Sequence, residues 1–192
     1  MLRILVAFAT TEGHTAKVAV ALQRRLRRGG HAVDIFNVGD VDLNPAMYDA
    51  IIVAASVHGG RYQAGVVHWV MRHVGALNAK PTAFVSVCLG VLQHDAKVQR
   101  ELQAIVDAFL QSTGWRPVDT RMVAGALKYT RYNFLVRWLM KRIVGKAGGD
   151  TDTSRDYEYT DWADLDRFAD GFTARLASLE NVGIGAVSGA TV

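Results

Sequence analysis

The first 22 residues join three patterns that together restrict how the chain can fold. Residues 2–8, Leu-Arg-Ile-Leu-Val-Ala-Phe, form an apolar run with the length of a strand, and a hydroxyl-rich loop with one glycine follows. Apolar side chains then recur at helical spacing, at Val18, Ala19, Leu22 and Leu26. The sequence therefore predicts a strand, a tight loop and a helix that begins near Thr15.

Four more runs of apolar residues have the length of strands. They cover residues 31–38, 50–55, 82–87 and 117–124. Segments with helical periodicity alternate with them, over residues 64–76, 95–112 and 161–179. This alternation predicts an α/β fold with a doubly wound, five-stranded parallel sheet in the order 2-1-3-4-5 and helices on both faces.

In a sheet of this order, ligands bind beyond the carboxyl ends of the strands, beside the first strand. Three loops are expected at that edge, over residues 10–15, 56–62 and 86–92. The first lacks the lysine ending of a nucleotide-triphosphate loop and the three glycines of a dinucleotide fingerprint. Hydroxyl groups at the start of a helix suit a terminal monophosphate instead, because the helix N-terminus offers unpaired N–H groups and positive dipole charge.

The composition is that of a globular protein. A chain of 192 residues, half of them hydrophobic, is expected to form one domain over residues 1–180. Residues 181–192 carry no charge and are expected to form a flexible tail. The single cysteine excludes an internal disulfide, and no run of about 18 uncharged apolar residues predicts a membrane span. The formal net charge of +4 favours anionic partners.

Residues 125–150 interrupt the alternation of strands and helices. This segment holds six basic residues and one acidic residue, so its net charge exceeds that of the whole chain. Aromatic and aliphatic residues lie between the basic ones. Such a segment suits an anionic lipid surface, or a flat apolar substrate that carries carboxylates. We interpret it as a long helical insertion near the fifth strand.

The loop Ala-Thr-Thr-Glu-Gly-His-Thr at residues 9–15, directly after an apolar strand, resembles the FMN phosphate loop of flavodoxins. The resemblance implies FMN as the cofactor, with this loop around the phosphate and the other two loops beside the isoalloxazine ring. The cofactor-binding residues implied in this way are Thr10, Thr11, Glu12, Gly13, His14, Thr15, Ser56, Val57, His58, Gly59, Ser86, Val87, Cys88, Leu89, Gly90 and Asp152.

A narrower resemblance extends over about residues 2–178. Four motifs carry it: Ala-Gly-Ala-Leu-Lys-Tyr at 124–129, Arg-Tyr at 131–132, Gly-Gly-Asp-Thr-Asp-Thr at 148–153 and Tyr-Thr-Asp-Trp at 159–162. They resemble the menaquinone-dependent protoporphyrinogen oxidase family, whose members are flavodoxin-like with a long insertion at this position. The resemblance implies oxidation of protoporphyrinogen IX to protoporphyrin IX in haem synthesis, with electrons passed through FMN to a membrane quinone.

The insertion is the expected contact region for substrate or membrane. Its basic side chains would pair with the porphyrinogen propionates or with anionic lipid, and its aromatic side chains would cover the ring. These residues are Lys128, Tyr129, Arg131, Tyr132, Arg137, Trp138 and Lys141. The resemblance implies a location in the cytoplasm or on the cytoplasmic face of the inner membrane. No nucleic-acid partner is expected, and the sequence leaves the oligomeric state open.

The sequence offers few groups for acid–base or metal chemistry. It shows no Ser/His/Asp set, no pair of catalytic carboxylates and no metal-ligand spacing. His14 and His58 fall in the predicted cofactor loops, where they could contact phosphate or flavin. Cys88 is expected to be a small buried side chain and not a redox thiol. We expect the flavin to carry the chemistry while the protein positions it.

Three other functions remain open from the sequence. A flavodoxin-like reductase of quinones or other small molecules would bleach its FMN rapidly with NAD(P)H. A non-enzymatic electron carrier would hold a one-electron-reduced flavin stably and would not turn over porphyrinogen. A binding module that kept the fold and lost the flavin would be colourless and would take up no added FMN.

Overall fold

The computed structural model describes residues 1–40, 42–93, 95–127, 145, 154 and 156–187. Five parallel strands form the main sheet: β1 (Arg3–Ala9), β2 (Ala32–Asn37), β3 (Ala50–His58), β5 (Thr82–Val87) and β6 (Asp119–Val123). Their order is β2-β1-β3-β5-β6. The predicted five-stranded parallel sheet and its order are confirmed, since only the two-residue strand β4 (Arg61–Tyr62) falls between the third and fourth of these strands in the chain.

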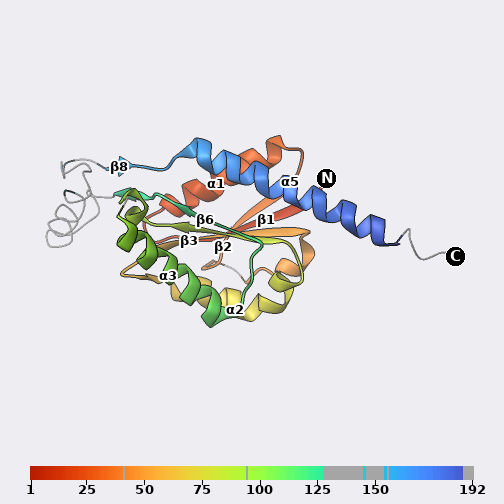
Figure 1. Cartoon of the computed structure of the whole chain (residues 1–192), viewed down its shortest axis with the longest axis horizontal. Helices are drawn as coiled ribbons and strands as arrows, with labels where there is room; N and C mark the ends of the chain where they lie inside the picture. Colours follow the sequence, from red (N-terminus) through yellow and green to blue (C-terminus); the bar gives the residue numbers. More distant parts are fainter. Residues whose placement is uncertain (41, 94, 128–144, 146–153, 155, 188–192) are drawn as a thin grey trace.

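Four helices cover the two faces of the sheet. Helices α1 (His14–Arg28) and α5 (Trp162–Val187) lie on one face, and α2 (Ala64–Asn78) and α3 (Ala96–Thr113) lie on the other (Figure 1). The predicted bounds of α1, α2 and α3 agree with the observed bounds within about two residues. Helix α5 continues to Val187, so residues 181–187 are helical where the sequence predicted a tail.

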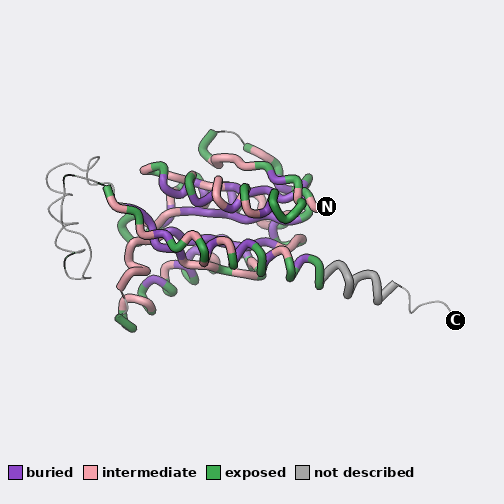
Figure 2. Tube along the Cα trace, turned by 90° about the horizontal axis from the view of Figure 1, so that it is seen from above, coloured by how far each residue is buried: buried purple, intermediate pink, exposed green. Residues whose placement is uncertain are grey.

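The core has two layers because side chains alternate along each strand. Ile4 and Val6 of β1 pack against α1 and α5, whereas Leu5 and Ala7 pack against α2 and α3. The segment 50–55 of β3 is buried throughout, as its continuous apolar sequence predicted. Figure 2 shows these buried strands between the outer helices, whose solvent-facing sides are exposed.

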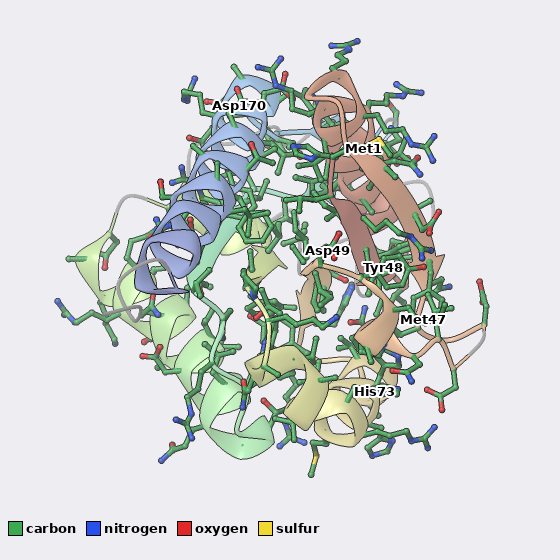
Figure 3. All side chains as sticks on the ribbon, turned by 90° about the vertical axis from the view of Figure 1, so that its right-hand side faces the viewer. Met1, Met47, Tyr48, Asp49, His73 and Asp170 are labelled. Atoms are coloured by element: carbon green, nitrogen blue, oxygen red, sulfur yellow. The ribbon has the colours of Figure 1, made fainter. Side chains whose placement is uncertain are left out.

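Polar contacts hold the connection that leads from β2 back to the start of β3 (Figure 3). Asp49 accepts a hydrogen bond from the backbone N–H of Arg3 at 2.7 Å, and the Arg3 guanidinium lies over the Tyr48 ring. Asp42 pairs with His73 and Arg72, and these hydrogen bonds hold the pKa of its carboxyl below the usual value. The charged side chains of this connection therefore serve the fold.

A second, two-stranded sheet was not predicted. Strands β7 (Ala126–Leu127) and β8 (Tyr157–Glu158) pair antiparallel and lie at the carboxyl edge of the main sheet. They bring together the chain before and after the predicted insertion. Within the predicted insertion, residues 128–144 and 146–150 lie outside the described residues, and with them most of the helical structure predicted there.

Candidate functional site

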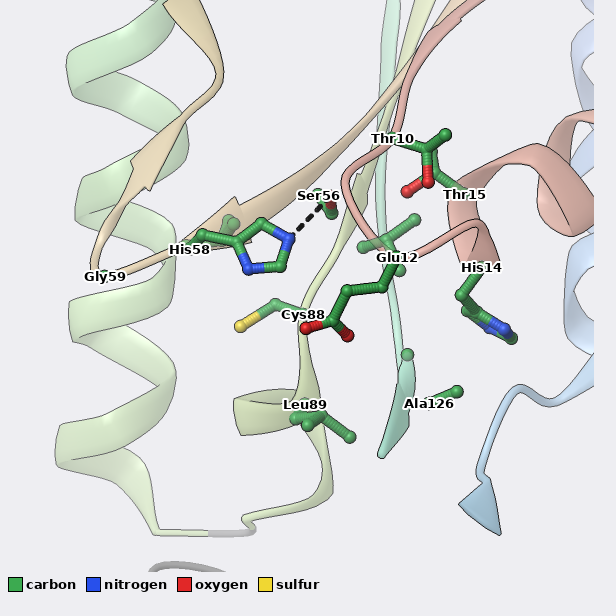
Figure 4. Close-up of a pocket in the computed structure, with 13 residues that line it drawn as sticks. Thr10, Glu12, His14, Thr15, Ser56, His58, Gly59, Cys88, Leu89 and Ala126 are labelled. Atoms are coloured by element: carbon green, nitrogen blue, oxygen red, sulfur yellow. Dashed lines mark hydrogen bonds between the residues drawn. The ribbon is translucent and has the colours of Figure 1, made fainter. Parts of the chain in front are cut away.

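A cavity of about 260 Å³ lies beyond the carboxyl ends of β1, β3 and β5, where the sequence placed the ligand (Figure 4). Larger hollows lie elsewhere: one of about 440 Å³ lies along helix α1, and one of about 520 Å³ lies between α3 and the segment of β4. The three predicted loops converge on the first cavity. The predicted site residues that line it are Thr10, Glu12, His14, Thr15, Ser56, Val57, His58, Gly59, Val87, Cys88 and Leu89.

The loop after β1 turns sharply into helix α1. Gly13 has a φ of 86°, a left-handed conformation that other residues rarely adopt, and its N–H donates to Oγ1 of Thr10 at 2.9 Å. The first turn of α1 holds no acidic residue, and Thr15 is 1% exposed. Figure 4 shows the carboxylate of Glu12 directed toward Cys88, away from Thr10 and Thr15. The helix N-terminus therefore presents neutral donors and dipole charge that suit an anion.

His14 is held by the segment that precedes α5. Its Nε2 lies 2.7 Å from Oγ1 of Thr160, and Thr160 donates its hydroxyl hydrogen to the carbonyl oxygen of Ala124. Because a hydroxyl has one hydrogen, Nε2 of His14 must donate to Thr160. Nearby, Lys17 pairs with Glu158 at 2.8 Å, and this hydrogen bond lowers the pKa of the Glu158 carboxyl.

The end of β3 and the residue that precedes α2 contribute a hydrogen-bonded group of polar side chains. Oγ of Ser56 lies 3.2 Å from Nε2 of His58, and Gln63 donates from Nε2 to Ser56 at 2.9 Å and to Thr11 at 3.1 Å. Gly59 and the next residue both have positive φ, 57° and 75°, which suits the tight turn between β3 and β4. This group joins the loop after β1 to the loop after β3.

The end of β5 divides between the cavity and the core. Val87 lines the cavity, whereas Ser86 is 2% exposed and its hydroxyl lies 2.7 Å from that of Tyr62, on the side of α2 and α3. Neighbouring residues of a strand face opposite sides of the sheet, and here Val87 lines the cavity while the side chain of Ser86 is buried against Tyr62. Burial raises the pKa of Tyr62 to about 12 and also raises the pKa of the Cys88 thiol.

Four described residues of the predicted set are not among those that line the cavity. They are Thr11, Gly13, Ser86 and Gly90. Thr11 is bonded to Gln63, Gly13 shapes the loop, and Gly90 packs against Leu102. Asp152 lies outside the described residues, as do the predicted substrate and membrane contacts Lys128, Tyr129, Arg131, Tyr132, Arg137, Trp138 and Lys141.

Four residues near the cavity were not among the predicted site residues. Gly125 and Ala126 line it, Thr160 holds His14, and Gln63 links two loops. Gln63 could have been noticed in the sequence, because it directly precedes a predicted helix, where Ser, Thr, Asp or Asn usually caps the helix. In the structure its side chain makes no capping hydrogen bond. Within the described part of the chain, no group of three or more metal-binding side chains occurs, and no helix is long and apolar enough to cross a membrane.

Comparison with known proteins agrees with this fold. The family model described as a flavodoxin domain matches residues 5–154. Flavodoxin 2 from Bacillus cereus superposes with a TM-score of 0.56 at 17% identity, over 90% of this chain and 99% of its own. Flavodoxin 1 from the same organism gives a TM-score of 0.54 at 15% identity, over 90% and 97%. The chain thus belongs to the class of flavodoxin domains.

Two curated relatives show to which family of flavodoxin-domain proteins the chain belongs. Protoporphyrinogen IX dehydrogenase [quinone] from Escherichia coli strain K12 is 34% identical over 170 residues, which is 88% of this chain and 93% of that protein. The Leishmania major protein of the same name is 33% identical over 174 residues, or 90% and 75%. The chain belongs to the protoporphyrinogen IX dehydrogenase (quinone) family, as the sequence motifs had predicted.

Proposed function

We propose that this protein binds FMN in the cavity at the carboxyl edge of the sheet and oxidises protoporphyrinogen IX to protoporphyrin IX, with a quinone as electron acceptor. The observation that carries the proposal is the convergence of the three loops, after β1, β3 and β5, on one cavity. The substrate and the acceptor are proposed from the names of the relatives. The cofactor is proposed from the flavodoxin domain.

The residues present fit FMN. A phosphate dianion would meet the N-terminus of α1 and the hydroxyl groups of Thr10 and Thr15, with no acidic side chain in the first helical turn. The cavity is slightly smaller than the usual ligand pocket of about 300–1,000 Å³, so part of the cofactor would lie outside it. When bound, FMN supplies the redox chemistry, accepting and releasing the electrons.

The protein's own part is to bind and orient the flavin. Val57, Val87 and Leu89 give an apolar lining on two sides of the cavity, which excludes water from a flat ring. Ser56 and His58 add hydrogen-bonding groups at the rim. In our proposal no side chain has to act as a strong base, because the flavin carries the redox chemistry.

The insertion would hold the porphyrinogen. Lys128, Arg131 and Arg137 would pair with its propionates, and Tyr129 and Trp138 would cover its ring. The same positive, aromatic segment would suit an anionic membrane surface, beside the hydrocarbon interior in which a quinone acceptor dissolves. The proposed location is therefore the cytoplasm, with peripheral binding to the cytoplasmic face of the inner membrane, as the family resemblance implies. Charge reversal at Lys128, Arg131 and Arg137 should raise KM or release the protein from anionic vesicles. Unchanged kinetics and unchanged vesicle binding would remove the insertion from the mechanism.

An absorbance spectrum of the purified protein, followed by assays of protoporphyrinogen oxidation with and without menaquinone, tests the proposal. We expect a flavin spectrum and porphyrin formation that depends on the quinone. A protein that takes up FMN but forms no porphyrin would overturn the substrate assignment. Rapid bleaching of the flavin by NAD(P)H would favour a reductase instead.

A further inference from the structure

Gln63 uses its side chain to join two other segments and not to cap the helix that it precedes. It precedes helix α2 with an extended backbone, and its side chain makes no hydrogen bond that caps the helix. Its Nε2 amide instead spans two loops, donating to Oγ1 of Thr11 at 3.1 Å and to Oγ of Ser56 at 2.9 Å. Both hydrogens of the amide are therefore used, and both go to hydroxyl groups at the proposed cofactor site.

The donation from Gln63 leaves the hydroxyl hydrogen of Ser56 free for the next hydrogen bond. Ser56 accepts from Gln63, so its own hydrogen is available for Nε2 of His58, which lies 3.2 Å from its oxygen. A ring nitrogen that accepts a hydrogen bond carries no hydrogen. A neutral His58 must then hold its proton on Nδ1.

A hydroxyl has two lone pairs, so Ser56 could accept from Gln63 and also from an Nε2–H of His58, but its own hydrogen would then have no acceptor among the described residues. The opposite direction with that hydrogen paired requires the amide of Gln63 to be turned by half a rotation. Oε1 would then accept from Thr11 and Ser56, and Ser56 would in turn accept from an Nε2–H of His58. In the observed orientation the atom left without a hydrogen-bond partner among the described residues is the buried Oε1. In the turned orientation it would be the NH₂ group. A buried donor without a partner is rarer than a buried carbonyl oxygen without one, which favours the observed orientation.

The second ring nitrogen of His58 faces away from Ser56, toward the side of the cavity where Cys88 lies (Figure 4). We propose that Gln63 is a positioning residue that fixes, through Ser56, the Nδ1–H tautomer of His58 and so presents an N–H donor to the cavity. Its partner is an acceptor atom, oxygen or nitrogen, of the ring system bound there. This inference rests on the proposed function for the identity of that ring as a flavin.

Nitrogen-15 NMR of the histidine rings in the FMN-free protein tests the tautomer directly. His58→Gln removes and thereby assigns the relevant signals, and the spectra are recorded at alkaline pH, where an imidazole is uncharged. We expect the Nδ1–H form in the unmodified protein. An Nε2–H form would overturn the proposal without any variant.

The variant Gln63→Glu reverses the relay while it keeps the shape of the side chain. A carboxylate only accepts, so Ser56 would donate to it and accept from His58, and the tautomer should change to Nε2–H. In a Ser56→Ala background the same change at residue 63 should leave the His58 tautomer unaltered. If Gln63→Glu alone left His58 in the Nδ1–H form, the relay through Ser56 would be contradicted.

Ligand affinity gives a second readout, which separates this inference from the proposed function. Riboflavin lacks the phosphate and so reports on ring contacts alone. Gln63→Glu should raise its dissociation constant by about 3-fold to 10-fold, the effect of one neutral hydrogen bond. An unchanged affinity for riboflavin would overturn the contact with the ring. If the unmodified protein bound neither riboflavin nor FMN, the proposed function would fail while the tautomer result still stood.

Discussion

His14 and Thr160 lie 146 positions apart in the chain, yet Nε2 of the histidine is 2.7 Å from the hydroxyl oxygen of the threonine. The Thr160 hydroxyl donates a hydrogen bond to the carbonyl oxygen of Ala124 at 2.7 Å. His14 and Thr160 are both buried. One hydroxyl thus connects the start of α1, the end of β6 and the chain that returns from the insertion.

Thr160→Val should destabilise the fold, because it leaves a buried ring nitrogen of His14 and the carbonyl oxygen of Ala124 without their partner. Each buried group that loses its hydrogen bond costs about 1–3 kcal/mol, so for the two groups the free energy of unfolding should fall by about 2–6 kcal/mol. Urea denaturation of the FMN-free protein measures it. Thr160→Ser keeps the hydroxyl and is the matched control. A valine variant as stable as the serine variant would contradict this role.

The pair of Lys17 and Glu158 should make a small contribution to stability that depends on pH. The hydrogen bond from Lys17 lowers the pKa of Glu158 below its ordinary value of 4.5. The stabilisation is then fully present above about pH 4.5 and is lost as the pH falls through the lower pKa of the folded state. Both side chains are partly exposed, so Glu158→Gln should cost only about 0.5 kcal/mol at pH 7.

A double-mutant cycle checks this pair. Glu158→Gln keeps an acceptor for the indole N–H of Trp162, which lies 3.2 Å from the Glu158 oxygen, so it removes mainly the charge. Its effect on the unfolding free energy should disappear in a Lys17→Met background and should shrink between pH 6 and pH 3. A cost that is equal at both pH values would show that charge is not involved.

Much of the fold could be predicted because it follows from local patterns. The continuous apolar run 50–55 can be satisfied only in a strand covered on both faces, and the alternation with helices then dictates a parallel sheet. The strands β7 and β8 have two residues each, too few for any periodicity, so they could not be found. Helix α5 continues into a segment of glycine, alanine and valine, whose composition favoured a tail.

The site was predictable where the residues belong to the strand ends and not where the contact is long-range. Thr10 directly follows β1 and His58 is the last residue of β3, two strands whose carboxyl ends meet at one edge, and both residues line the cavity. Thr160 approaches His14 only because β8 pairs with β7, and no pattern near either residue indicates that pairing. The sequence also does not show which of a strand's last residues face the cavity, so Ser86 was assigned to it together with its neighbour.

Thr15→Val should weaken the binding of FMN and leave that of riboflavin unchanged. The residue is 1% exposed, so a valine of similar shape keeps the packing and removes only the hydroxyl. A hydrogen bond to a charged group contributes about 1.5–3 kcal/mol, which corresponds to a loss of about 10-fold to 150-fold in affinity. Titration of the FMN-free protein with each flavin, followed by fluorescence quenching, measures both constants. Equal losses for the two ligands would place the hydroxyl away from the phosphate.

Cys88 should react slowly with alkylating reagents, although it lines the cavity. Burial raises the pKa of its thiol above the ordinary value of 9.0, and only the thiolate is nucleophilic. At pH 7.5 iodoacetamide should label it more slowly than it labels glutathione, and the rate should still be rising at pH 9. Added FMN should slow the reaction further, because the flavin would cover the cavity.

Mass spectrometry of the intact chain follows the reaction, and Cys88→Ser, which leaves the chain without a thiol, is the blank. Labelling at the rate of glutathione would mean that the thiol is accessible and ionised, and Cys88 would then be a candidate for redox chemistry beside the flavin.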